Sequence, residues 1–184
     1  MKTMRAWRHL SLPGLLSAVL LLACTGERPP AKLAFVDVAA RNGNVEVTFQ
    51  SDLQFFDLFS KNRQQRPVLS ELACALDKVA DLTFEHRPAR FAKGSIEPAG
   101  AASQGGAYRF KSALQFWRSA TDPNGSDEAL DDARLTETLA DRQSIPCIVR
   151  MTIHLSQPYY TRPMLVPVDR ILAAIPAAAT TETQ

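Results

Sequence analysis

Apolar and polar residues alternate in several stretches of the chain, as they do in strands that turn one face to a core and the other to water. The first two stretches, Leu33–Arg41 and Asn44–Ser51, flank Asn42-Gly43. Asn-Gly between alternating segments is the strongest short-range signal of a two-residue β-hairpin. This turn places Val36 opposite Phe49 and gathers the apolar residues of both segments on one face. We therefore expect an antiparallel hairpin at the start of the folded chain.

Further alternating stretches predict more strands. Residues 108–116 and 147–155 each carry apolar side chains on one face and polar side chains on the other, which is typical of half-buried antiparallel strands. A shorter strand is expected at residues 164–168, where Pro163 just before it and Pro167 within it favour the edge of a sheet. Residues 82–85 are a weaker strand candidate.

Two stretches favour helices. Residues 68–80 place leucines three and four residues apart, as on one side of a helix. Leu72, Cys74 and Leu76 also alternate as in a strand, so the spacing leaves both structures open, and the length of the stretch favours a helix. Residues 127–141 begin with acidic side chains, which suit a helix N-terminus, and carry a narrow apolar stripe typical of a surface helix.

These elements predict the fold class. Residues 92–107 are rich in Gly, Ala and Ser and are expected to form a loop. The rest predicts a mainly β fold, an antiparallel β-sandwich-like domain with one or two short helices, which spans residues 33–175 as a single domain. The alternative is an α+β fold with the helices packed on one antiparallel sheet. Residues 176–184 are expected to form a disordered tail.

The N-terminus carries a targeting pattern. Residues 1–9 are basic, and residues 10–22 form an apolar run of 13 residues. That run is too short to span a bilayer as a helix but fits the core of a signal peptide. It ends in Leu21-Leu22-Ala23-Cys24, which resembles the lipobox of bacterial lipoproteins.

The resemblance implies a lipid anchor. Residues 1–23 would be removed as the signal peptide, and Cys24 would become the first mature residue and carry acyl chains such as palmitate. Thr25 in the next position favours sorting to the outer membrane. We expect residues 24–32 to form a lipidated tether. Its two adjacent prolines stiffen it, and it has no residues that could build a core.

The charge balance gives no case for a nucleic-acid partner. The formal net charge is +2, but three basic residues lie in the predicted signal peptide, and the remainder carries −1. Charge is uneven along the chain, with an excess of three positive charges in residues 61–93 and of six negative charges in residues 122–141. The first segment could touch anionic headgroups and the second a basic partner, although a solvated surface accounts for each.

Cys74 and Cys147 are the cysteines that remain beyond Cys24. In an oxidising periplasm we expect them to form a disulfide. The closed loop of roughly 70 residues would contribute about 4 kcal/mol to stability. On a strand, Cys74 would pin one sheet to another, and on a helix it would link helix to sheet. Two separate buried thiols are the alternative.

Patterns that indicate chemistry are weak. Beyond the signal peptide the chain holds two histidines, His86 and His154, too few for a zinc site once the cysteines are paired. Asp122, Asn124 and Ser126 begin like a calcium loop, but the required glycine and the final acidic ligand are missing from their positions. We expect no catalytic residue, no metal site and no cofactor.

Aromatic residues near strand ends suggest a binding surface. Trp117, Tyr159 and Tyr160 are of the kind that dominates interface hot spots, so we expect them to contact a partner. The leading function is a non-enzymatic outer-membrane lipoprotein, facing the periplasm, that binds another envelope protein as an accessory or assembly factor. The alternatives are an inhibitor or immunity-type lipoprotein and, less favoured, a small-ligand carrier or a hydrolase.

Overall fold

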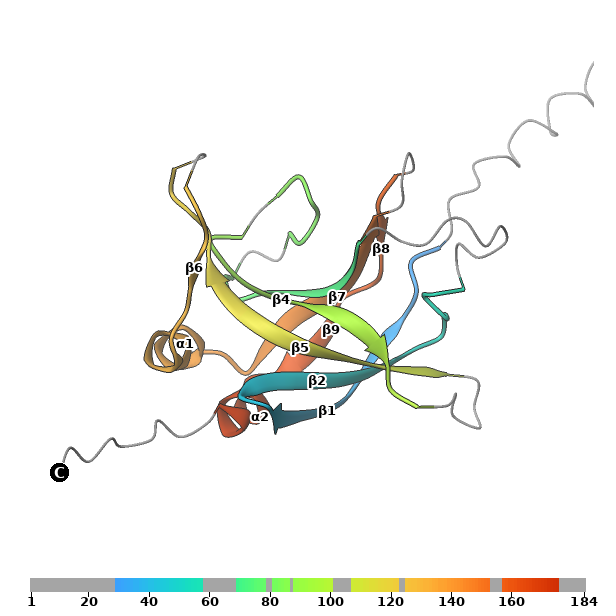
Figure 1. The fold of residues 1–184 in the computed structure, drawn as a ribbon, viewed down its shortest axis with the longest axis horizontal. Helices are drawn as coiled ribbons and strands as arrows, with labels where there is room; N and C mark the ends of the chain where they lie inside the picture. Colours follow the sequence, from blue (N-terminus) through green and yellow to red (C-terminus); the bar gives the residue numbers. More distant parts are fainter. Residues whose placement is uncertain are drawn as a thin grey trace, which may run out of the picture.

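The computed structural model describes most of the chain beyond the predicted signal peptide (Figure 1). The described residues are 29–57, 69–78, 81–86, 88–100, 107–122, 125–152 and 157–175. The predicted signal peptide, Cys24, His154 and the predicted tail lie outside them, so what was expected of these segments stays a prediction.

Strands dominate the described residues, which confirms the predicted mainly β, sandwich-like class. The elements are β1 (Leu33–Arg41), β2 (Asn44–Ser51), β3 (Leu69–Ala75), β4 (Arg90–Pro98), β5 (Tyr108–Arg118), β6 (Glu128–Ala129), α1 (Asp132–Leu139), β7 (Ser144–Thr152), β8 (Tyr159–Tyr160), β9 (Met164–Pro167) and α2 (Val168–Ala174). All strand pairs are antiparallel, in the order β1-β2-β5-β4-β3-β7-β8, with β6 beside β5 and β9 beside β7.

The sheet curls around its own core. The long strand β5 pairs with β2 over its first part and with β4 and β6 over its last part, so it belongs to both halves. The two ends of the sheet approach each other, because β1 contacts β9 and the backbone N–H of Arg162 donates to the carbonyl oxygen of Ala31 at 2.9 Å. In Figure 1, β1 and β2 lie next to α2, the helix that follows β9 and contacts all three strands.

Gly94 permits the sharp crossing of β4 and β5. A Cβ atom at this position would lie 2.1 Å from the carbonyl oxygen of Ala113 and 2.6 Å from Oγ of Ser112. The two strands pair on both sides of this point. A glycine inside a strand is typical of such a close approach of two backbones, which lets the sheet bend over its core.

We predict that Gly94→Ala lowers the free energy of unfolding by about 2 kcal/mol, the cost of forcing an extra methyl group into a packed site. Urea denaturation followed by tryptophan fluorescence measures this. Ser95→Ala is the matched control, because Ser95 is exposed on the same strand and its replacement should change stability by less than about 0.5 kcal/mol. Equal stability of the two variants would contradict the close crossing.

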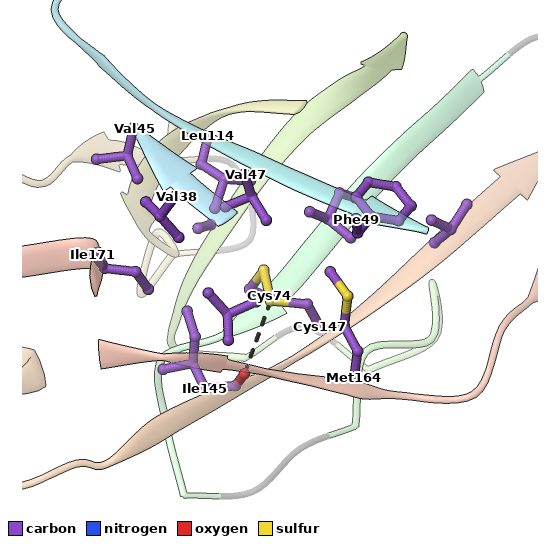
Figure 2. Packing of buried hydrophobic residues seen from close by; sticks show 14 of the residues in the cluster. Val38, Val45, Val47, Phe49, Cys74, Leu114, Ile145, Cys147, Met164 and Ile171 are labelled. Atoms are coloured by element: carbon purple, nitrogen blue, oxygen red, sulfur yellow. Dashed lines mark hydrogen bonds between the residues drawn. A yellow bond between two sulfur atoms is a disulfide. The ribbon is translucent and has the colours of Figure 1, made fainter. Parts of the chain in front are cut away.

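The core fills the inside of the curl. Figure 2 shows side chains of β2 and β5, such as Val47 and Leu114, pointing toward Ile145 and Met164 of β7 and β9. Helix α2, which the sequence pattern did not predict, adds Ile171 to this core and packs on β1. The fully buried large side chains are Phe49, Phe55, Phe110, Leu72, Leu76, Leu114, Leu139, Ile145, Met151, Ile171, Val47 and Val149.

The predicted hairpin is confirmed at its turn. Asn42 and Gly43 have φ angles of 50° and 76°, the left-handed backbone that a type I′ turn requires. The expected register holds from the turn through Val38, which lies opposite Val47, as far as Asp37, which lies opposite Thr48.

Further from the turn, the predicted register is wrong by one residue. A β-bulge between Phe35 and Asp37 places Phe35, and not Val36, opposite Phe49. Because the bulge adds a residue, the alternation changes sides, and Leu33 and Phe35 pack against the core. The larger apolar side chains are thereby turned inward, which the strict alternation of the sequence does not indicate.

The helix predicted for residues 68–80 is wrong in the described part, where β3 is a strand. Leu72, Cys74 and Leu76 point into the core, so the alternation and not the helical spacing decided the structure. The other face of β3 carries Ala73 and Ala75, which are also buried, in a second small cluster with Leu82. A strand buried on both faces has no clear polar side, and its pattern therefore resembles that of a buried helix.

The loop predicted for residues 92–107 is wrong in its first part. Residues 90–98 form β4, which lies between β3 and β5 in the middle of the sheet. Its small residues are used for close packing against β5 and not for a turn.

The remaining elements follow the predictions more closely. The predicted surface helix is present as α1, where the side chain of Asp131 caps the N-terminus by accepting from the backbone N–H of Arg134 at 2.8 Å, and Leu135 and Leu139 are buried. Strands β5, β7 and β9 also lie in the stretches expected to form them. Residues 82–85 do not form a strand.

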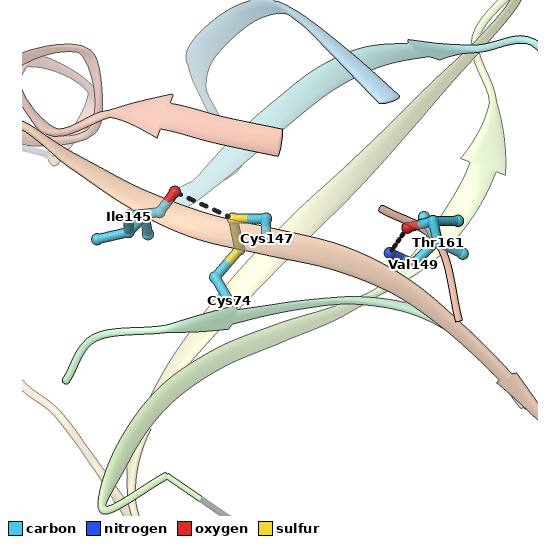
Figure 3. The surroundings of a disulfide bond; sticks show 5 residues. All are labelled: Cys74, Ile145, Cys147, Val149 and Thr161. Carbon is cyan, nitrogen blue, oxygen red and sulfur yellow. Dashed lines mark hydrogen bonds between the residues drawn. A yellow bond between two sulfur atoms is a disulfide. The ribbon is translucent and has the colours of Figure 1, made fainter. Parts of the chain in front are cut away.

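The predicted disulfide between Cys74 and Cys147 is present (Figure 3). The two residues lie directly opposite each other on β3 and β7, with their Cα atoms 4.0 Å apart, and both are fully buried. The bond therefore links neighbouring strands of one sheet, and the expected pin between two sheets is wrong. Next to it, the backbone N–H of Val149 donates to Oγ1 of Thr161 at 2.9 Å, which holds the chain beyond β8 against β7.

Candidate functional site: a basic cleft beside α1

A cleft lies where α1 meets one end of the sheet. Its volume is about 360 Å³. The segment that follows β3, the start of β4, the end of β5, α1 and the turn after α1 all contribute to its walls. The lining residues are Leu76, Asp77, Lys78, Arg90, Arg118, Arg134, Glu137, Thr138, Asp141 and Arg142.

Arg90 is held in the cleft by three hydrogen bonds. Its Nε donates to Oδ1 of Asp77 at 3.0 Å, and its backbone N–H donates to Oδ2 of the same carboxylate at 2.7 Å. One Nη donates to Oγ1 of Thr138 at 3.4 Å, across the cleft on α1. These contacts fix the plane of the guanidinium group at the start of β4.

Arg142 lies near Arg90. One of its Nη atoms donates to the carbonyl oxygen of Leu76, the residue that follows β3. This hydrogen bond joins the turn after α1 to the sheet. Two arginines of the cleft are thus held in place by contacts with fixed groups of the fold.

Arg118 and Arg134 share one carboxylate. Glu128 of β6 lies 2.6 Å from Nη1 of Arg134 and 3.8 Å from Nη1 of Arg118. Arg134 also lies 3.6 Å from Asp131. The hydrogen bond with Glu128 raises the pKa of Arg134, and the nearby Asp131 carboxylate adds to the rise. The shared carboxylate is mostly engaged by Arg134, so Arg118 is the more loosely paired of the two.

Residues of the two charged segments meet in the cleft. Lys78 and Arg90 come from the basic segment, whereas Glu137 and Asp141 come from the acidic segment, and the fold brings the two together. Five cations and three carboxylates line the cleft, and two further carboxylates, Glu128 and Asp131, pair with Arg118 and Arg134 beside it, so the cations are balanced in number by carboxylates. Guanidinium groups present several N–H donors in one plane, so this arrangement favours binding of an anionic group.

A second polar arrangement covers the outer face of β3 and β7. Nε of Arg150 lies 2.5 Å from Oε1 of Glu71, and both side chains are largely buried. The guanidinium carbon of Arg150 lies 4.5 Å from the centre of the Phe84 ring, and that ring lies 5.8 Å from the ring of Tyr160. Tyr160 accepts a hydrogen bond from the backbone N–H of Phe84 at 3.1 Å. Burial raises the pKa of Tyr160, the nearby Glu85 carboxylate adds to the rise, and the hydrogen bond from Phe84 opposes it.

His86 belongs to the same covering segment, residues 81–86. Its Nδ1 lies 2.9 Å from the carboxylate of Asp81, which also accepts from the backbone N–H and the hydroxyl of Thr83. The hydrogen bond from the Thr83 backbone lowers the pKa of Asp81, and the Thr83 hydroxyl lowers it further. These contacts hold the segment in shape against the sheet. The cavity beneath it measures only about 50 Å³.

The structure does not join the three predicted contact residues into one surface. Tyr159 packs against the main core, whereas its neighbour Tyr160 faces the outer cluster. Trp117 lies on β5, and strands β4, β3 and β7 separate it from β8. Its Nε1 is buried and has no hydrogen-bond partner among the described residues.

Tyr159 has a different role near the N-terminus. Its hydroxyl accepts from the backbone N–H of Ala31 at 2.8 Å and donates to the carbonyl oxygen of Pro29 at 3.2 Å. These bonds tie the start of the described chain to β8. The predicted tether is therefore attached to the folded domain at residues 29–31.

The sequence interpretation missed the basic cleft. The charged segments were visible as runs, but Arg118 and Arg142 stand alone in the sequence, and only the fold brings them beside Arg90. Within the described ranges, no three His, Cys, Asp or Glu side chains come together as a possible metal site. In the same part of the chain, no helix has the length and hydropathy that crossing a bilayer requires.

The described chain is thus a mainly β domain with a disulfide inside its sheet and a basic cleft at one end. In comparisons of sequence and structure, no protein-family model, curated protein or solved structure matches it.

Proposed function

We propose that the protein is an outer-membrane lipoprotein whose β domain is a non-enzymatic binding module held at the periplasmic face. The observation that supports this proposal is the short connection between Cys24, which we propose is acylated, and the folded domain. Cys24 lies five residues before Pro29, where Tyr159 begins to hold the chain. Five residues span at most about 18 Å, so the lipid would keep the domain close to the membrane surface.

A lipid anchor at this point would hold the domain at the membrane. Two or more acyl chains give stable anchoring, whereas one is marginal. The cleft beside α1 offers fixed guanidinium donors, which suit recognition of an anionic partner or ligand. An envelope protein remains the partner that we propose for the domain as a whole.

We predict that Cys24→Ala abolishes the incorporation of labelled palmitate and removes the protein from the outer-membrane fraction, because the acyl chains have no thiol to which they can be attached. Metabolic labelling and membrane fractionation measure the two effects. Thr25→Ala is the matched control and should keep its label, since the acylated thiol is retained.

In-cell crosslinking of the full chain, with Cys24→Ala beside it, then tests the binding role. A single stoichiometric envelope protein that is captured only by the anchored form supports the proposal, and its identity separates an assembly factor from an inhibitor of a hydrolase. Palmitate labelling that survives Cys24→Ala would contradict the lipid anchor. Capture of no specific protein would contradict the proposed partner.

A further inference from the structure

The basic cleft holds arginine donors that internal contacts only partly use. A guanidinium group has five N–H donors. The contacts of Arg90 with Asp77 and Thr138 engage two of its five side-chain donors, and the contact with Leu76 engages one donor of Arg142. Because the same contacts fix the two side chains, binding a ligand would cost little further side-chain entropy.

Arg118 completes the basic side of the cleft. It is the last residue of β5, its side chain is 48% exposed, and its contact with Glu128 is 3.8 Å long. The same carboxylate is held at 2.6 Å by Arg134. Arg118 can therefore turn toward a ligand without leaving Glu128 unpaired.

The donors and the size of the cleft indicate the kind of anion. A phosphate monoester carries about −1.5 to −2 charges at pH 7 and offers three acceptor oxygens. These oxygens suit the N–H donors that Arg90, Arg118 and Arg142 keep beyond their internal contacts. Arginine binds phosphate oxygens in pairs, with two parallel N–H donors. A volume of about 360 Å³ holds a small molecule.

The position of the cleft indicates where the ligand comes from. The chain that arrives from Cys24 joins β1, whose Leu33 pairs with Ser51 of β2, and Ser51 in turn pairs with Tyr108 at the start of β5. The cleft lies at the other end of β5, ten residues away, which is about 33 Å along the strand. If β5 points away from the membrane, the cleft lies on the far side of the domain from the anchor, which favours a soluble ligand over a membrane headgroup.

From these observations we propose that the basic cleft binds a soluble small molecule that carries a phosphate monoester. The proposal gives a ligand class to the binding module described above and rests on the lipid anchor only for the choice of a soluble ligand over a membrane headgroup.

Isothermal titration of the full chain in non-ionic detergent with glycerol 3-phosphate tests the proposal. We expect saturable binding of one ligand per chain, with Arg118→Gln weakening the affinity about tenfold, as loss of a charge-assisted hydrogen bond does. Arg41→Gln is the matched control and should bind as the wild type does. Arg41 is exposed on the β1–β2 hairpin, where it pairs with Glu46 at 3.3 Å. Thermal unfolding of both variants checks that the fold is retained.

Two further titrations separate the ligand sources. Acetate should bind at least tenfold more weakly than glycerol 3-phosphate, because it has one negative charge and two acceptor oxygens. Phosphatidylcholine vesicles that contain phosphatidic acid present the same phosphate monoester on a membrane. Binding to these vesicles alone would overturn the proposal, as would an absence of saturable binding or an equal loss of affinity in Arg41→Gln. The titration in detergent uses no membrane, so its failure leaves the lipid anchor untouched, and a failure of palmitate labelling leaves the titration untouched.

Discussion

Replacing Cys74 and Cys147 together by alanine should lower the free energy of unfolding by about 4 kcal/mol, because the disulfide closes a loop across 73 residues and limits the unfolded chain. The loop contains β4, β5, β6 and α1, so its ends are otherwise held together only through the folded sheet. A domain of this size is stable by about 5 to 15 kcal/mol, so the double variant would lose between about a quarter and four fifths of its stability. Urea denaturation at neutral pH measures the loss.

Reduced wild-type protein separates the two contributions to this effect. Reduction removes the cross-link but keeps both sulfur atoms in the core, whereas Cys74→Ala/Cys147→Ala also removes their volume. We expect the reduced protein to lose most of the same stability and the double variant to lose slightly more. A double variant within about 1 kcal/mol of the oxidised wild type would contradict the stabilising role of the disulfide.

Phe110→Ala should cost about 4 kcal/mol, the usual loss when a buried phenylalanine is truncated and leaves a cavity. Phe110 is fully buried on β5, and its ring centre lies 4.8 Å from that of Phe55, 5.7 Å from Phe49 and 6.0 Å from Phe56. The substitution therefore removes one ring from the middle of an aromatic group. The change in the urea midpoint, at a constant slope, measures the loss.

Leu165→Ala is the control for this prediction. Leu165 is a large apolar residue in a strand of the same sheet, but it is 61% exposed. Its truncation should change stability by less than about 0.5 kcal/mol. Similar losses in Phe110→Ala and Leu165→Ala would show that the aromatic group is not the packed centre of the domain.

The hairpin could be predicted because all of its information is local. Asn42-Gly43 adopts the turn, and the residues next to it pair in the only register that the turn allows. The prediction failed at Val36, where the bulge is set by packing of Phe35 against distant parts of the core. The rules that use neighbouring residues therefore predicted the strand pairing only as far as the turn fixes the register.

Strands β3 and β4 could not be predicted because their patterns depend on what covers them. Leu82, from a segment beyond the strand, buries the outer face of β3, so no polar face marks it as a strand. In β4, the close crossing of β5 requires a residue without a side chain at Gly94. In the sequence alone, where the crossing is not visible, a glycine indicates a loop.

The basic cleft could not be predicted from the sequence for a related reason. Arg90, Arg118 and Arg142 lie on separate elements and have no common spacing in the sequence. Charge counting detected that basic and acidic segments exist, but not that they meet. Only the strand order, which places the start of β4 beside the ends of β3 and β5, assembles the cleft.

The cross-strand disulfide also has a mechanical consequence. When tension pulls the two ends of the chain apart, the covalent link between Cys74 and Cys147 carries the force past everything between them. The 73 residues of the loop would otherwise add about 260 Å to the stretched length. If the chain is tethered to a moving membrane, as we propose, and is pulled by a partner, it would lengthen only through the segments outside the loop. The residues that line the basic cleft all lie between the two cysteines and would be shielded from the pull.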